Sequence, residues 1–370
     1  PFILGLAGLL YQLYRNKKDF WVVMLLFVLT GIAIVVYLNQ YPYQPRERDY
    51  AFAGSFYAFS IWIGLGVLAL YQAVRKAFDN PVGATITSAV CLVFVPGIMA
   101  AENWDDHDRS GNFISNDFAY NALNTCEPNS ILFSYGDNDT FPLWYAQEVE
   151  GVRTYVRVSN LSYLRADSYI DQMKRKAYES DAVPVSMTNE KYVTGTRDLV
   201  LAVDRINKHI NVKQAIDFVL SDDPGTKVNS PVDMNEKLDF FPSKSLMLPV
   251  DKRLIEEKEV VRAEKMSNIV DTMKWRLSNN YLLKDGLFLM DLMAHNNWER
   301  PMYFVITVSS DTYQNLDKFF QLEGLTYRIV PIEAKRVSGR YGNVDSEIMY
   351  NNLMNVYRWR SIANPNVYIN

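Results

Sequence analysis

Residues 130–160, SILFSYGDNDTFPLWYAQEVEGVRTYVRVSN, decide the fold of the larger part of the chain. The segment 130–136 is apolar and ends in turn residues, which is typical of a buried strand, and residues 154–160 have the same character. Between them, residues 141–149 carry apolar side chains at helical spacing, and Gly151 supplies a stop. This succession indicates a β-α-β unit, so the two strands are predicted to be parallel.

Further predicted elements surround this unit. A helix is expected at 113–124, and the polar stretch 221–236 is expected to be a loop or an insertion. The other predicted elements are strands at 245–250, 273–282, 301–308 and 325–332, and helices at 284–295 and 315–323. Because strands and helices alternate, residues 102–370 are predicted to form a soluble α/β domain with a mainly parallel sheet.

The first 101 residues are of a different kind. Three runs without a charged side chain, at 21–38, 50–74 and 81–101, are each long enough to cross a hydrocarbon layer of about 30 Å. Residues 1–14 form a shorter apolar stretch, which is interpreted as the cut end of another span. Residues 1–101 are therefore predicted to be a membrane helical bundle of about four spans, the C-terminal part of a larger membrane domain.

Charge predicts the topology of this bundle. Two short loops are basic, with Arg15, Lys17 and Lys18 in the first and Arg75 and Lys76 in the second. Basic loops stay in the cytoplasm, so residues 102–370 are expected outside it, in the periplasm, or in a lumen if the source is eukaryotic. Residues 102–370 hold 31 Lys and Arg against 38 Asp and Glu, and this acidic balance argues against a nucleic-acid partner.

One set of candidate site residues follows the first predicted strand. Asp137, Asn138, Asp139 and Thr140 lie where ligands bind in open α/β sheets, at the carboxyl end of a strand. Carboxylates and an amide at this place can bind a sugar hydroxyl or a hard cation. The alternative is that Asn138 or Asp139 only caps the following helix.

A second set follows the last apolar run. Trp104, Asp105, Asp106 and His107 combine an aromatic ring with acidic groups, as sugar-binding and metal-binding sites do. They equally fit a solvated exit from the membrane with an interfacial Trp. No metal site or cofactor is assigned, because the possible ligands are few and local. Residues 296–300, Asn-Asn-Trp-Glu-Arg, are interpreted as a structural turn.

Two arginines occupy a loop that the topology places outside. Arg46 and Arg48 follow Pro42 and Pro45, which stiffen the backbone. A guanidinium group at a membrane surface can bind a lipid phosphate through two hydrogen bonds. The alternative is a solvated loop in which the arginines pair with neighbouring carboxylates.

Three stretches together resemble a known family: QPRERDYAF at 44–52, residues 111–151 around GDNDTFPLWYAQEVEG, and NNWERPMYF at 296–304. They resemble large bacterial membrane proteins of a family of unknown function, which is similar to eukaryotic protein O-mannosyltransferases acting on plexin-type receptors. The resemblance implies a GT-C glycosyltransferase that transfers a sugar, mannose, from a polyprenyl-phosphate donor to a protein or glycan acceptor outside the cytoplasm. It also implies that Arg46 and Arg48 bind the donor phosphate.

The same resemblance leaves the catalytic base unassigned. GT-C enzymes generally carry their catalytic carboxylate in a first external loop, and this chain is interpreted as a C-terminal fragment in which that loop is absent. The expected partners are membrane lipids, the lipid-linked donor and a secreted protein or glycan. The competing prediction is a non-catalytic α/β domain, anchored in the membrane, that binds glycan or protein.

Overall fold

A computed structural model describes residues 1–40, 48–78, 80–108, 110–231, 233, 235–335, 339, 341–360 and 362. The chain forms two compact units, Pro1–Ser110 and Gly111–Asn370, which are called here the membrane unit and the soluble unit. The predicted boundary at 101/102 falls inside helix α6 (Ile98–His107), which continues the last apolar run beyond Ala101.

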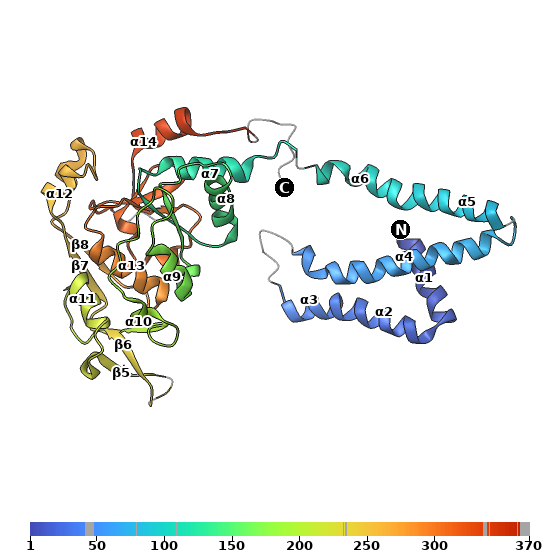
Figure 1. The fold of residues 1–370 in the computed structure, drawn as a ribbon, viewed down its shortest axis with the longest axis horizontal. Helices are drawn as coiled ribbons and strands as arrows, with labels where there is room; N and C mark the ends of the chain where they lie inside the picture. The colour runs from blue at the N-terminus through green and yellow to red at the C-terminus, as the bar shows by residue number, and fades with distance from the viewer. Residues whose placement is uncertain are drawn as a thin grey trace. The chain divides into compact units, whose positions relative to one another are not determined.

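The membrane unit is helical throughout its described residues (Figure 1). Its elements are α1 (Phe2–Arg15), α2 (Lys17–Thr30), α3 (Ile32–Leu38), η1 (Asp49–Phe52), α4 (Ala53–Val74), α5 (Asn80–Leu92), the π-helical turn η2 (Val93–Gly97) and α6. Three segments within the described residues are long and apolar enough to span a membrane: Lys17–Leu38, Asp49–Val74 and Pro81–Trp104.

Residues 1–14, interpreted as the cut end of a fourth span, form helix α1, and that interpretation stays a prediction. Helix α1 packs along α4, against which its small residues Gly5 and Gly8 are buried. The chain is thus a membrane protein with three candidate spans among its described residues.

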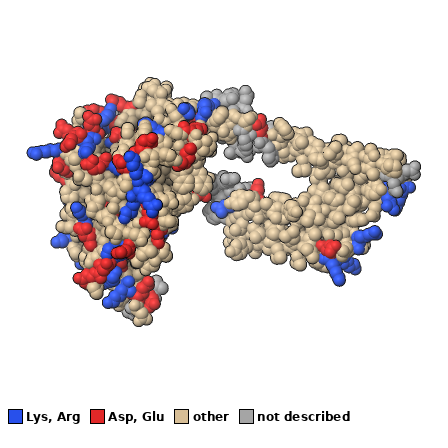
Figure 2. Space-filling view, viewed as in Figure 1, with Lys and Arg blue, Asp and Glu red and all other residues tan. Residues whose placement is uncertain are grey.

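The charged residues of the two units are distributed differently (Figure 2). Acidic and basic side chains are scattered over the visible face of the soluble unit. Most of the visible surface of the membrane unit is uncharged, and Lys and Arg gather at the end where the α1–α2 and α4–α5 turns lie. The two basic loops on which the predicted topology rests are therefore at the same end of the helices.

The soluble unit is built on a six-stranded sheet with the order β13-β11-β12-β10-β1-β2. Strands β1 (Ile131–Ser134) and β2 (Arg157–Asn160) are parallel and are joined by helix α8 (Asp137–Glu148), which confirms the predicted β-α-β unit. Strand β10 (Met302–Val305) lies parallel on the other side of β1, with Ile131 opposite Met302.

The sheet is mixed, so the prediction of a mainly parallel sheet is too simple. Strand β12 (Thr326–Ile329) is antiparallel to both β10 and β11 (Phe320–Leu322), and β11 pairs in parallel with β13 (Asn343–Val344). The helix predicted at 315–323 is wrong, because residues 317–319 form a short 3-10 turn and β11 follows at once. Tight chain reversal brings β12 back antiparallel, a connection that does not need a crossover helix.

Two smaller sheets complete the unit. One has the order β5-β6-β3-β9, formed by Lys227–Asn229, Lys237–Phe241, Leu199–Ala202 and Tyr281–Leu283. The other has the order β4-β7-β8, formed by Ile210–Asn211, Ser245–Pro249 and Thr272–Arg276. The strand predicted at 273–282 is thus two strands in different sheets. The region 221–236, expected to be a loop or an insertion, contributes β5 to one of them.

Helices fill the space around the sheets. They are α7 (Ile114–Thr125), α9 (Asp167–Met173), α10 (Asn189–Tyr192), α11 (Val212–Val219), α12 (Lys252–Glu257), α13 (Lys284–His295) and α14 (Ser346–Asn351). Helix α13 is the central one, since its residues from Lys284 to Met293 are all buried. Strands β1 and β10 are buried along their whole length, as expected for strands that are covered on both faces.

Candidate functional site

The carboxyl ends of β1 and β2 are tied together by Thr140. Its hydroxyl lies 2.8 Å from the Ser134 hydroxyl at the end of β1, and it accepts a hydrogen bond of 2.7 Å from the Asn160 amide at the end of β2. Thr140 is fully buried. The structure therefore places this predicted site residue inside the fold, where it sets the spacing of the two strand ends.

The other three predicted residues of this set form the first turn of α8. Gly136 occupies the N-cap position with φ 88°, a left-handed conformation that favours glycine, and no side chain caps the helix. The alternative in which Asn138 or Asp139 serves as the cap is therefore wrong. Asp137 and Asp139 lie in the first turn, where acidic groups interact favourably with the helix dipole.

The two carboxylates face different surroundings. Asp137 is exposed and accepts a hydrogen bond of 3.2 Å from the Tyr163 hydroxyl, and partial burial together with this bond raises the pKa of Tyr163. Asp139 is 8% exposed, and burial raises its pKa although Thr307, beyond β10, donates to it. Asp137 and Asn138, rather than Asp139, are thus the groups at this edge that solvent or a ligand can reach.

An aromatic row, which consists of Phe141, Trp144 and Tyr163, runs beside Asp137. The ring centroids of Phe141 and Trp144 are 5.8 Å apart, those of Trp144 and Tyr163 are 5.9 Å apart, and both pairs are tilted by about 30°. Phe141 is 49% exposed. The sequence prediction missed this row; the three-residue spacing of Phe141 and Trp144 placed them on one helix face, but nothing showed that Tyr163 joins them.

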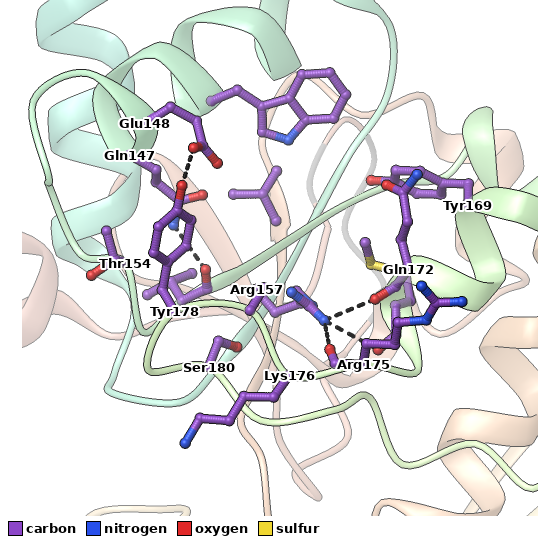
Figure 3. A pocket seen from close by; sticks show the side chains of 15 residues that line it. Gln147, Glu148, Thr154, Arg157, Tyr169, Gln172, Arg175, Lys176, Tyr178 and Ser180 are labelled. Atoms are coloured by element: carbon purple, nitrogen blue, oxygen red, sulfur yellow. Dashed lines mark hydrogen bonds between the residues drawn. The ribbon is translucent and has the colours of Figure 1, made fainter.

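A cavity of about 510 Å³ opens next to the aromatic row, along the free side of β2 (Figure 3). It exists because β2 is the last strand of the sheet, so its outer side meets side chains of α8 and α9 instead of another strand. The lining residues are Trp144, Gln147, Glu148, Thr154, Val156, Arg157, Val158, Tyr169, Gln172, Met173, Arg175, Lys176, Ala177, Tyr178 and Ser180.

Arg157 brings a buried positive charge to this cavity. It is 6% exposed, and its Nη2 donates to the backbone oxygens of Gln172 at 3.0 Å, Met173 at 3.4 Å and Arg175 (Figure 3). Its buried Nε has no hydrogen-bond partner among the residues that the structure describes. Among the described residues no carboxylate forms an ion pair with Arg157.

The opposite wall is closed by hydrogen bonds to two glutamates. The Tyr178 hydroxyl donates to Glu148 of α8, and the Thr154 hydroxyl donates to Glu179 at 2.6 Å. Tyr178 has φ 51°, a left-handed backbone conformation that is uncommon for a residue other than glycine. Figure 3 shows Tyr178 and Glu148 on one side and Arg157 with Arg175 on the other.

The second predicted set belongs to the membrane unit. Trp104 is 76% exposed on α6, while the side chains of Asp105, Asp106 and His107 lie outside the described residues. No group of three or more His, Cys, Asp or Glu side chains is arranged to hold a metal ion in the part of the chain that the structure describes.

Of the two arginines predicted to bind phosphate, Arg46 lies outside the described residues. Arg48 is exposed and directly precedes η1, and within the described residues its guanidinium forms neither a hydrogen bond nor an ion pair. A pairing of Arg48 with Asp49, one of the carboxylates in the alternative interpretation, is therefore not observed. The binding of a lipid phosphate stays a prediction.

The turn at 296–300 is structural, as predicted. The Asn296 amide donates to the Arg300 backbone oxygen at 2.8 Å, while Asn297 and Trp298 adopt φ of 47° and 59°. Arg300 is buried, and its guanidinium donates to the backbone oxygens of residues 129, 130, 181 and 182 and to the Ser180 hydroxyl. The turn thus fastens the start of β10 to two neighbouring segments.

Comparison with known proteins finds one family. The model of the TMEM260-associated domain 2 matches residues 115–348, which include the aromatic row, the cavity and the turn at 296–300. No curated protein and no solved structure matches the chain.

Proposed function

Since the chain belongs to the family of the TMEM260-associated domain 2, we propose that it is part of an integral membrane glycosyltransferase whose soluble unit holds the acceptor. The observation that carries this proposal is the aromatic row beside Asp137. One face of a pyranose ring presents C–H groups, which pack well on the electron-rich face of an aromatic ring. The hydroxyl groups at the edge of the sugar then meet the Asp137 carboxylate and the Tyr163 hydroxyl.

The membrane unit supports the same proposal. Its two basic loops lie at one end of the helices, so the proposed orientation puts the soluble unit on the periplasmic side of a bacterial inner membrane. On that side the donor is a polyprenyl-phosphate sugar, mannose by the family resemblance, and the acceptor is a secreted protein or a glycan. Arg46 and Arg48 are proposed to bind the donor phosphate, and the departing phosphate needs such cationic groups.

A second candidate function is glycan or protein binding without catalysis. The observation in its favour is that both carboxylates of the sheet edge are engaged, Asp137 with Tyr163 and Asp139 with Thr307. A general base needs a carboxylate that is free to accept a proton from the acceptor hydroxyl. The soluble unit would then recruit the acceptor for chemistry performed elsewhere.

Saccharide binding by the full chain in lipid nanodiscs tests the role of the aromatic row. Phe141→Ala and Trp144→Ala should weaken the binding of methyl mannoside and methyl glucoside about two- to tenfold, equivalent to about 0.5–1.5 kcal/mol for a stacked aromatic contact. Tyr350→Ala is the matched control, because Tyr350 is 66% exposed on α14 and forms no aromatic contact with described residues. Equal binding by all three variants and the parent would contradict the proposed acceptor site.

Transfer of labelled mannose from polyprenyl-phosphate mannose by the full-length protein, which includes the external loop expected to carry the catalytic carboxylate, separates the two candidate functions. In that protein Arg48→Ala should lower the transfer rate about ten- to a hundredfold, the loss of one charge-assisted contact, and leave saccharide binding unchanged. Saccharide binding without any transfer by the full-length protein would favour the non-catalytic function.

A further inference from the structure

Four arginines are buried among the described residues of the soluble unit, and they fall into two pairs. The first pair has carboxylate partners. Arg328 donates to both oxygens of Glu127 at 2.6 and 3.0 Å, and Nε of Arg197 lies 3.4 Å from Oδ2 of Asp239. Arg157 and Arg300 have only backbone oxygens and one hydroxyl as partners among the described residues. A buried charge normally has an opposite charge beside it, because the interior solvates it poorly.

The two arginines without carboxylate partners lie close to each other at the cavity. Arg157 lines the cavity directly, and Ser180, another lining residue, accepts a hydrogen bond of 2.9 Å from Arg300. Burial, and then the charge of Arg157, lower the pKa of Arg300 to about 10. The charge of Asp181 partly offsets this effect on Arg300, but no carboxylate of the described residues forms an ion pair with either guanidinium, so positive charge remains at the cavity.

Two exposed residues add to this potential. Arg175 and Lys176 line the cavity, and their charged groups form no hydrogen bond or ion pair with described residues. Glu148 is the single acidic residue in the described lining, against three basic ones, while the charges of Asp171 and Glu179 act on Arg175 and Lys176 from outside the lining. This is notable in a region, 102–370, where acidic residues outnumber basic ones by 38 to 31. Such a local field attracts an anion.

The remaining lining fits a sugar ring better than a bare inorganic anion. Trp144 belongs to the aromatic row and also lines the cavity, where Tyr169 and Tyr178 add two more rings. The side-chain amide of Gln172 has no partner among described residues and is free to bind a hydroxyl group. The volume, about 510 Å³, falls within the range of about 300–1,000 Å³ that is usual for small-molecule sites.

We propose that this cavity binds an acidic monosaccharide, a pyranose that carries a carboxylate or a phosphate group, as part of the acceptor. The anionic group lies toward Arg157, Arg175 and Lys176, and the ring lies against Trp144 and Tyr178. The inference rests on the proposed function, which it deepens by naming the chemical class of the acceptor. Arg175 and Lys176, the exposed basic residues that form the rim of the cavity, give specificity for the acidic group. Arg157 supplies the buried positive charge behind this rim.

Calorimetry on the full chain in zwitterionic nanodiscs tests this proposal. The probes are methyl glucuronide, glucose 6-phosphate, the neutral methyl glucoside and inorganic phosphate. Both acidic sugars should bind about ten- to a hundredfold more tightly than the neutral sugar, the effect of one charge-assisted contact, and the preference should shrink as NaCl is added. If methyl glucuronide binds more tightly than glucose 6-phosphate, the acceptor carries a carboxylate. If glucose 6-phosphate binds more tightly, the acceptor is phosphorylated.

Charge reversal at the rim provides the variants. Arg175→Glu combined with Lys176→Glu should abolish the preference for the acidic sugars, and both residues are exposed, so the fold should survive. Lys213→Glu is the matched control, because Lys213 is exposed on α11 and does not line the cavity. Arg157→Lys should also reduce the preference. If that variant fails to fold, the rim variant still decides.

Three outcomes would overturn the proposal. Equal affinity for neutral and acidic sugars, unchanged in the rim variant, would remove the acidic acceptor but leave the proposed saccharide function intact. Inorganic phosphate that binds as tightly as glucose 6-phosphate would show a site for the anion only. If no sugar binds, while the full-length protein still transfers mannose to a peptide, the acceptor is recognised through its protein part and the cavity has another role.

Discussion

In the membrane unit, α1 and α4 approach each other at glycines, whereas in the soluble unit the elements meet through large side chains and buried arginines. A Cβ added to Gly8 would lie 1.7 Å from the Trp62 backbone oxygen, and one added to Gly66 would lie 2.1 Å from that of Leu4. The only polar link buried in this contact, within the described residues, is the hydrogen bond of 2.7 Å from the Trp62 indole to Gln12.

Ion pairs link elements within the soluble unit, whereas α1 and α4 of the membrane unit are joined by close contact of their backbones. All ion pairs between described residues lie in the soluble unit, and several involve a buried group, such as Lys284 between Asp167 at 2.7 Å and Asp198 at 2.8 Å. The difference follows from the surroundings. Lipid gives no hydrophobic advantage to packing one apolar helix on another, so helices in it associate by dispersion contacts at small residues.

The sharpest way to test this contrast is to enlarge a glycine of the α1–α4 contact. Gly8→Leu should destabilise the membrane unit by about 4 kcal/mol, above the usual cost of overpacking, because the obstacle is a helix backbone that cannot move aside. Gly64→Leu is the control, since a Cβ at Gly64 meets nothing within 4 Å. Thermal unfolding in detergent, followed by circular dichroism, should show a large loss for Gly8→Leu and no loss for Gly64→Leu.

A somewhat smaller loss of stability is expected in the soluble unit when Arg300 is replaced. Arg300→Met should lower the free energy of unfolding by about 3 kcal/mol, because it leaves buried backbone oxygens without donors. Arg253→Met on α12 removes an exposed arginine and should change the stability by less than about 0.5 kcal/mol. Urea unfolding monitored by tryptophan fluorescence measures both. Similar losses in the two variants would mean that Arg300 does not fasten β10 to its neighbours.

The smallest expected effect concerns pH. The hydrogen bond from Lys284 is the main cause that lowers the pKa of Asp198 below its ordinary value of 3.8. A carboxylate with a lowered pKa stabilises the folded state above its ordinary pKa, and this contribution disappears as the pH falls through the lowered value. Asp198→Asn should therefore be less stable than the parent at pH 7, and the difference should shrink as the pH falls below 3.8 toward the lowered pKa.

Melting temperatures of the parent and Asp198→Asn between pH 7 and pH 2.5 measure this difference. Asp217→Asn, at an exposed residue of α11, serves as the control. A difference between parent and Asp198→Asn that stays constant down to pH 2.5 would show that Lys284 and Asp198 are not coupled in solution.

Much of the architecture follows from the sequence by local rules. The uncharged runs of 18 to 25 residues identify three candidate spans, because only a long apolar helix can place its backbone in lipid. Helix α13 was predicted at its observed bounds, and β1, β2 and β10 lie within their predicted segments. The failures occurred where a short apolar segment fits a helix or a strand equally well, as at 315–323.

The candidate site depended on tertiary structure. The sequence placed Asp137 and Asp139 together, but only the fold exposes the first and buries the second. Tyr163 joins Phe141 and Trp144 because β2 ends beside β1, and Arg157 faces a cavity because β2 is the edge strand. Local spacing determines which side chains share a face of one helix or strand. Strand order, which depends on contacts between distant segments, determines which of those faces meet and which charges remain without a partner.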